Sequence, residues 1–204
     1  IEVTKDEWDI FYEKQQLNYS KYNTYKVEDY MKANLVFKDS IGEVVIPNIG
    51  LRNRGNTSLN LIKNSNGEPL LSHWKINFKH TFNNTVMDNK DRNYFDLEGL
   101  DLKYNRNNNP NYLAESYSLD MFNEFDVYAQ ETSQVLLYIN IGGAIYKYGV
   151  YTIFEPIDEK FITRRFGSTE DGNLYKSLWQ GYGPALLNPI KNDKEIGLEE
   201  INYH

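Results

Sequence analysis

The stretch LRNRGNTS, residues 51–58, sets two arginines beside a glycine and short polar side chains. An arginine guanidinium pairs with two phosphate oxygens at once, and a glycine lets a ligand approach the backbone closely. The same residue types also join two strands, because Asn56 and Ser58 can satisfy local backbone groups. Arg54 and Gly55 are therefore candidates for a phosphate-binding loop, with a plain strand junction as the alternative.

Further along the chain, charged residues follow an order that is typical of nucleotide-binding kinases. Lys75 and Lys79 alternate with apolar residues in HWKINFKH, Glu115 lies early in a predicted helix over residues 110–124, and Glu155 ends a predicted hairpin. In protein kinases a strand lysine holds the nucleotide phosphates and a helix glutamate orients that lysine. Lysines on any solvated strand face would give the same pattern, so the order alone is a weak indication.

The spacing of apolar residues predicts the helices that carry these side chains. Thr4 and Glu7 have the spacing of a capping box, which predicts a helix over residues 5–17. Asn109 can cap the helix over residues 110–124, and Pro110 suits its first helical position. The buried face of this helix is predicted to consist of Leu113, Tyr117, Met121 and Phe122.

Alternation of apolar and polar residues predicts the strands. It is strict in HWKINF, and SQVLLYINIGGAIYKYGVYTIFE has the pattern of a hairpin with a Gly-Gly turn. Pro156 and Gly167 bracket a third, short helix, and GNLYKSLW predicts one more strand. The expected fold class is α+β, with an antiparallel sheet of about five strands and helices packed on it.

Composition excludes several classes of site. There is no cysteine, so thiol nucleophiles, disulfides and cysteine-ligated zinc are impossible, and the three histidines lack zinc spacing. We therefore predict no metal site in this chain. The net charge of −7 argues against nucleic-acid binding, which needs clustered Lys and Arg. No apolar run approaches the roughly 20 residues of a membrane span, whereas a secretion signal upstream of Ile1 stays open.

Five blocks of the sequence, in order from about Leu35 to Lys176, resemble the spore coat protein H (CotH) kinase family. LRNRGNTS resembles its R-G-N-S-S signature, and HWKINF its aromatic-basic-aliphatic strand. NNNPNYLAESYSLDMFNEF is similar to its D-P-S-Y-L-R-E helix. VLLYINIGGAIYKYGVYTIFEPIDEKFI is similar to its hairpin, and GNLYK to its L-Y-K strand.

The resemblance implies an atypical protein kinase with a small lobe of the kinase type. It implies ATP with Mg or Mn as cofactor in the intact protein, and Ser or Thr of spore coat or extracellular proteins as substrate. The location would be the spore coat or the outside of a bacterium. The nucleotide-binding residues it implies are Arg54, Gly55, Lys75, Glu115, Glu155 and Lys176.

The chain also departs from the family pattern. Ser72 and His73 stand where the family has a lysine, and Ala114 replaces a helix arginine. The catalytic aspartates of the family should follow Lys176, and no such pattern is present there. We therefore expect no catalytic residue in this chain and no activity of the chain alone. The expected division is an N-terminal helix and lead-in strand (1–34), a CotH-like small lobe (35–180) and the start of a truncated C-terminal region (181–204).

A carbohydrate-binding or surface-assembly module, of a spore coat or a cellulosome-type complex, is the alternative function. The chain has 17 tyrosines and three tryptophans, and SLWQGYGPALL could present aromatic rings to a sugar. Core packing is the competing explanation for these aromatic residues. Binding of nucleotide as opposed to polysaccharide would separate the two functions.

Overall fold

Alternating side chains place one face of each strand inside and the other outside. The computed structural model describes residues 1–55, 58–82, 91–105 and 113–167. Leu100 and Leu102 face the core, for example, while the residues between and after them, Asp101 and Lys103, face outward. The strands are β1 (Glu2–Val3), β2 (Met31–Lys38), β3 (Glu43–Arg54), β4 (His73–Asn77), β5 (Gly99–Tyr104), β6 (Thr132–Ile141) and β7 (Ala144–Phe154).

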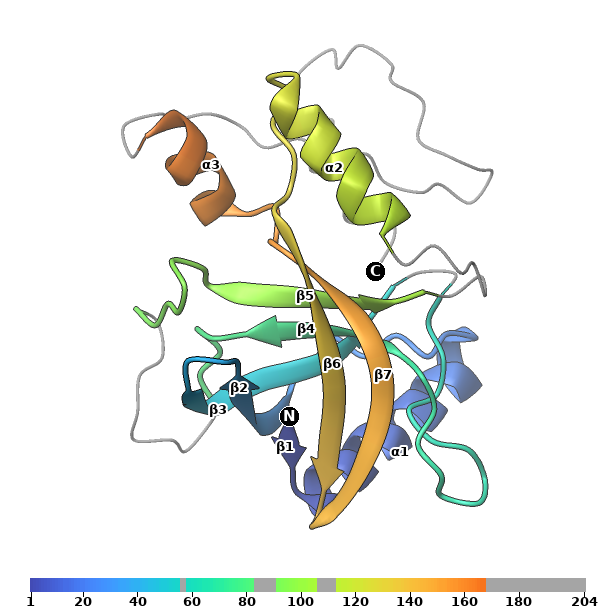
Figure 1. Ribbon diagram of the computed structural model, residues 1–204. Helices are drawn as coiled ribbons and strands as arrows, with labels where there is room; N and C mark the ends of the chain where they lie inside the picture. The colour runs from blue at the N-terminus through green and yellow to red at the C-terminus, as the bar shows by residue number, and fades with distance from the viewer. Residues whose placement is uncertain (56–57, 83–90, 106–112, 168–204) are drawn as a thin grey trace. The chain divides into compact units, whose positions relative to one another are not determined.

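In the described residues these strands form one closed barrel, in the order β1-β2-β3-β4-β5-β7-β6 (Figure 1). All neighbours are antiparallel except β1 and β6, which run parallel and close the barrel. The amide of Asn140 donates to the carbonyl of Ile1 at 2.8 Å, and that of Gly142 to Val3 at 2.9 Å. The predicted α+β fold, an antiparallel sheet with helices packed on it as in a kinase small lobe, is therefore wrong. A closing strand of two residues is too short to leave an alternating pattern in the sequence.

Helix α1 (Lys5–Tyr22) brings aromatic side chains into the barrel core. Trp8 and Phe11 are both buried, and the ring of Trp8 lies 5.6 Å from that of Trp74. The helix begins as predicted, since the Thr4 hydroxyl accepts from the amide of Glu7 at 3.2 Å. The Glu7 carboxylate does not complete a capping box, because it accepts from the amide of Lys32 at 3.0 Å and so ties α1 to β2.

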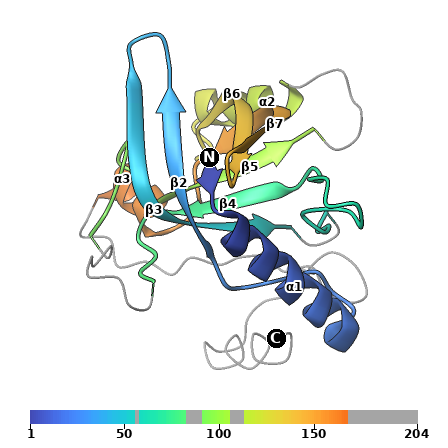
Figure 2. The ribbon, with the colours of Figure 1, turned by 90° about the horizontal axis from the view of Figure 1, so that it is seen from below.

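Strands β2 and β3 continue beyond the barrel as a two-stranded arm, which is visible in Figure 2. Strand β4 pairs with β3 only from Gly50 onward, so the segment from Glu43 to Ile46 pairs with β2 alone. Ile41 at the tip of the arm is 95% exposed.

Helix α2 (Ala114–Glu124) has its apolar stripe turned away from the barrel. Leu113, Tyr117, Met121 and Phe122 are between 42% and 65% exposed, so the prediction that they form a buried face is wrong. Helical spacing shows that such a stripe exists but not what covers it. Ser116 is the buried residue of the helix. The predicted start, at Asn109 and Pro110, lies outside the described residues.

The hairpin and the third helix agree with the sequence. Strands β6 and β7 are joined at Gly142 and Gly143, both with positive φ, which glycine adopts without strain. Helix α3 (Glu159–Phe166) ends at Gly167 as predicted, although Asp158 caps its start by accepting from the amides of Lys160 and Phe161. The strand predicted in GNLYKSLW lies outside the described residues.

Gln15 joins α1 to the chain between β3 and β4. It is fully buried, donates to the carbonyl of Asn60 at 3.0 Å and accepts from the amide of Ile62 at 3.0 Å. Replacement Gln15→Leu leaves the Ile62 amide without its partner and leaves the Asn60 carbonyl only the 3.4 Å bond from the Asn53 side chain, so we expect the free energy of unfolding to fall by about 2 kcal/mol. Urea denaturation measures this change. The control is Gln16→Leu next to it, an exposed side chain that donates to the Tyr12 hydroxyl, which should change stability little. Equal losses in both variants would contradict this role of Gln15.

Candidate functional site

An ion pair connects the outer face of the barrel to α2. The ammonium of Lys103, on β5, is hydrogen-bonded to the Glu115 carboxylate in the first turn of α2. The same ammonium lies 4.7 Å from the centre of the Phe154 ring, on the neighbouring strand β7. The carboxylate and the ring together limit the directions in which this lysine can point, while its side chain stays 33% exposed. It is a positioned cation that a ligand can reach.

A second contact attaches the first turn of α2 to the barrel. The Gln134 amide, on β6, donates to the Ser116 hydroxyl at 2.9 Å and to the Thr152 hydroxyl at 3.0 Å. Because Ser116 follows Glu115 directly, this bond holds the carboxylate over the end of β5. The orientation of Lys103 therefore depends on residues from β5, β6, β7 and α2.

A second cation lies two strands away on the same outer face. Arg54 ends β3, and its guanidinium is 3.1 Å from one oxygen of Asp101 on β5. The other oxygen of Asp101 is buried without a hydrogen-bond partner in the described part of the chain. Lys75 is the cross-strand neighbour of Asp101 on β4, and among the described residues its ammonium has no ion-pair partner. These groups and Lys103 share one face because strand side chains alternate.

Gly55, directly after Arg54, has a backbone conformation that favours glycine. Its φ is +129°, a value that side-chain-bearing residues rarely adopt, and a Cβ there would lie 2.1 Å from the Ser58 hydroxyl oxygen. Only glycine fits this place without moving the chain.

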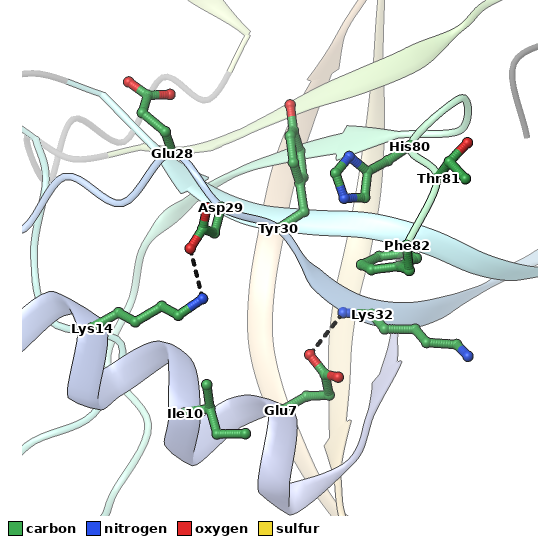
Figure 3. Close-up of a pocket in the computed structure, with 10 residues that line it drawn as sticks. All are labelled: Glu7, Ile10, Lys14, Glu28, Asp29, Tyr30, Lys32, His80, Thr81 and Phe82. Carbon is green, nitrogen blue, oxygen red and sulfur yellow. Dashed lines mark hydrogen bonds and ion pairs between the residues drawn. The ribbon is translucent and has the colours of Figure 1, made fainter. Parts of the chain in front are cut away.

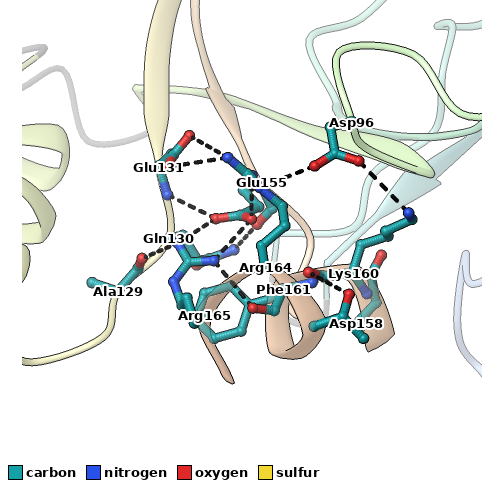
Figure 4. A network of polar contacts seen from close by, with 11 residues as sticks. Asp96, Ala129, Gln130, Glu131, Glu155, Asp158, Lys160, Phe161, Arg164 and Arg165 are labelled. Atoms are coloured by element: carbon teal, nitrogen blue, oxygen red, sulfur yellow. Dashed lines mark hydrogen bonds and ion pairs between the residues drawn. The ribbon is translucent and has the colours of Figure 1, made fainter. Parts of the chain in front are cut away.

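Glu155 lies in a separate network, shown in Figure 4. Its carboxylate is buried and accepts from Arg164 at 2.8 Å and from Arg165 at 2.7 and 3.0 Å. Arg165 also donates to the carbonyl of Ala129, and Arg164 reaches Glu131. The carboxylate thus fastens α3 to the segments that precede β6 and follow β7.

The predicted site residues do not all meet. Arg54, Gly55, Lys75 and Glu115 lie on or next to the outer face around β5, Glu155 is bonded to the α3 arginines, and Lys176 is outside the described residues. The lysine that pairs with Glu115 is Lys103, which was missed in the sequence together with strand β5. The alternation of LDLKY just before the helix was the available signal. The aromatic segment SLWQGYGPALL is likewise outside the described residues. Nucleotide contact by the predicted residues stays a prediction.

Comparison with known proteins identifies the family. A family model described as CotH kinase protein matches residues 51–199, most of the 204-residue chain. The chain belongs to the CotH kinase family. No curated protein matches it. As a CotH family member it has a kinase-related function, and the family points in general to use of nucleotide and metal.

The matched region of this CotH family member begins with LRNRGNTS and includes the Lys103–Glu115 ion pair. Among the described residues, no group of three or more His, Asp or Glu could hold a metal ion. None of the described helices is long and apolar enough to cross a membrane.

Replacement of the buried Glu155 carboxylate tests its structural role. Glu155→Gln keeps the shape but takes the carboxylate away from Arg165 and leaves Arg164 only the more exposed carboxylates of Glu131 and Asp96, so we expect the free energy of unfolding to fall by about 3 kcal/mol. The matched control is Glu159→Gln, an exposed residue in the first turn of α3, which should change stability by less than about 0.5 kcal/mol. Urea denaturation gives both values. Unchanged stability of Glu155→Gln would mean that the two arginines find other partners.

Proposed function

We propose that this protein binds ATP with Mg or Mn and serves an atypical protein kinase reaction, with Lys103 as the lysine that contacts the phosphates. The ion pair between Lys103 and Glu115 carries this proposal. A lysine on a strand, oriented by a glutamate on the following helix, is the arrangement by which protein kinases hold nucleotide phosphates. Family membership supports the same class of reaction.

The charges on the outer face suit a polyphosphate. Lys103, Arg54 and Lys75 supply three cations along β3, β4 and β5, and the unbonded oxygen of Asp101 lies among them. Phosphoryl transfer depends mainly on positioning and on neutralising the charge of the phosphates. Bound ATP would supply the phosphoryl group. Glu115 and Phe154 would keep the Lys103 ammonium aimed at its phosphates, and Gly55 would let the backbone approach them.

The proposed acceptor is Ser or Thr of a spore coat or extracellular protein, and the proposed location is the spore coat or the outside of the cell. Family membership is the support for both. Kinases bring the acceptor hydroxyl in line with the phosphoryl group. The acceptor therefore has to approach the same outer face of the barrel.

Nucleotide binding separates Lys103 from Lys75. In a titration of the chain with a fluorescent N-methylanthraniloyl ATP and MnCl₂, we expect Lys103→Met to raise Kd at least about tenfold, because a charge-assisted hydrogen bond to phosphate is lost. Glu115→Gln should raise Kd less, by about threefold, because Lys103 keeps its charge but is no longer oriented by a carboxylate. The control is Lys147→Met, which replaces an exposed lysine near the start of β7 and should bind nucleotide like the unchanged chain.

The same titration can reject the assignment. If Lys75→Met weakens binding while Lys103→Met does not, Lys75 is the phosphate lysine that the sequence predicted. The Lys103–Glu115 pair then only holds α2 in place. If no nucleotide binds with either metal, the proposed nucleotide site on this face is wrong.

A further inference from the structure

A second feature of the molecule lies apart from the β5 face, where α1 passes β2. A pocket of about 760 Å³ opens there, shown in Figure 3. One wall is made of three ring side chains, Tyr30, His80 and Phe82, with Lys32 of β2 below Phe82, and Glu7 and Lys14 of α1 lie on the opposite side. None of these residues takes part in the ion pairs around Lys103 or Glu155.

The ring wall is held rigidly. The rings of Tyr30 and His80 are 4.6 Å apart, and those of His80 and Phe82 are 4.5 Å apart and nearly perpendicular. Tyr30 and His80 rest directly on the backbone of Gly50, where a Cβ would come within 2.9 Å of the Tyr30 ring and 2.8 Å of His80. A preformed aromatic surface loses little conformational freedom when a ligand binds.

The charges that line the pocket largely neutralise one another. Lys14 pairs with Asp29 at 2.6 Å, and Glu28 pairs with Arg52, whose guanidinium lies over Tyr30. Burial lowers the pKa of His80, so its imidazole is neutral at neutral pH. An anionic ligand such as nucleic acid would meet the carboxylates of the pocket. The lining suits an uncharged ligand with many hydrogen-bonding groups.

A neighbouring pocket extends the same surface. It has a volume of about 510 Å³ and shares Glu7 and Lys32 with the first, so the two adjoin. Asn34 and Asn140 line it, and each uses its amide oxygen to accept from a backbone amide, at 3.1 and 2.9 Å. Their Nδ2 groups have no partner among the described residues and remain available as donors. Together the pockets form a groove with rings at one end and amides at the other.

We propose that this groove binds a neutral, extended glycan, with Phe82 as the ring that packs against a sugar and with Tyr30 and His80 supporting the wall in which Phe82 lies. The flat apolar faces of sugar rings pack against aromatic rings, while carboxylates, amides and ammonium groups bond the hydroxyls. Glu7 and Lys32, at the junction of the two pockets, would bond the sugar in the middle. An extended peptide is less suited as a further strand beside the pocket, because the edge of β2 is occupied there: the amide of Lys32 donates to Glu7, and Ala33 and Asn34 pair with β1.

Glycan binding goes beyond the proposed kinase function and rests on different residues. The groove is formed mainly by α1, β1, β2, the β6–β7 turn and the segment after β4, whereas the candidate phosphate site lies around β5 and α2. The two sites can therefore be tested separately on one protein.

Affinity electrophoresis in native gels tests the proposal, with hydroxyethylcellulose, barley β-glucan or birchwood xylan in the gel. We expect at least one polysaccharide to retard the chain. Phe82→Ala and, separately, Lys32→Met should each weaken that retardation, Phe82→Ala by about tenfold in apparent Kd, since a ring surface is lost. Tyr117→Ala removes an exposed ring on α2, outside the groove, and should migrate like the unchanged chain. Melting temperatures identify any variant that fails to fold.

Three outcomes overturn the proposal. One is the absence of retardation by all three polysaccharides. Another is retardation that both groove variants retain, which would place the sugar elsewhere. The third comes from a titration with a peptide digest of casein: binding that Phe82→Ala abolishes, without any polysaccharide binding, would make the groove a peptide site. Binding of the fluorescent ATP should be unchanged in Phe82→Ala, so a failure here is distinct from failure of the nucleotide site.

Discussion

The parallel pairing of β1 with β6 is the contact on which the rest of the barrel depends. A sheet that ends in free strands leaves backbone amides and carbonyls without partners, and burial of such groups is costly. Two residues of β1 satisfy both ends at once, since they pair with β2 on one side and β6 on the other. The helix that follows directly, α1, is thereby brought to the barrel with Trp8 and Phe11 directed into its core. The same closure creates the corner between α1 and β2 in which the groove lies.

The register of the strands determines which residues meet in the candidate site. Residues 54, 75, 101 and 103 are far apart in the chain, and the pairing of β3 with β4 and of β4 with β5 brings them onto one outward face. Only the Glu115 carboxylate comes from a helix. The inward face of the same strands is filled with Leu51, Trp74 and Ile76, so the site is supported by close-packed core side chains. The barrel therefore fixes the positions of the cations on its strands, and the attachment of α2 to the barrel fixes the position of the Glu115 carboxylate.

Local patterns in the sequence were reliable where neighbours along the chain decide the structure. The start of α1 at Thr4, strand β4, the β6–β7 hairpin and the end of α3 at Gly167 were all predicted, and the family was identified from ordered blocks. Features decided by distant residues were not. Barrel closure depends on a two-residue strand, and the pairing partner of Glu115 depends on register, so Lys75 was chosen and Lys103 overlooked. The apolar stripe of α2 was recognised, but helical periodicity does not reveal whether another segment covers it.

The exposed stripe of α2 has a consequence for how the molecule fluctuates. The helix is tied to the barrel by the Lys103–Glu115 pair and the Ser116–Gln134 bond, both near its first turn, while Tyr117 and Phe122 face outward. Elements with few buried apolar contacts open locally at a small fraction of the global unfolding free energy. Amide hydrogens of α2 should thus exchange with solvent through excursions that leave the barrel intact. Each excursion would separate Lys103 from its carboxylate. The fraction of molecules in which Glu115 orients Lys103 would therefore equal the fraction in which α2 is docked.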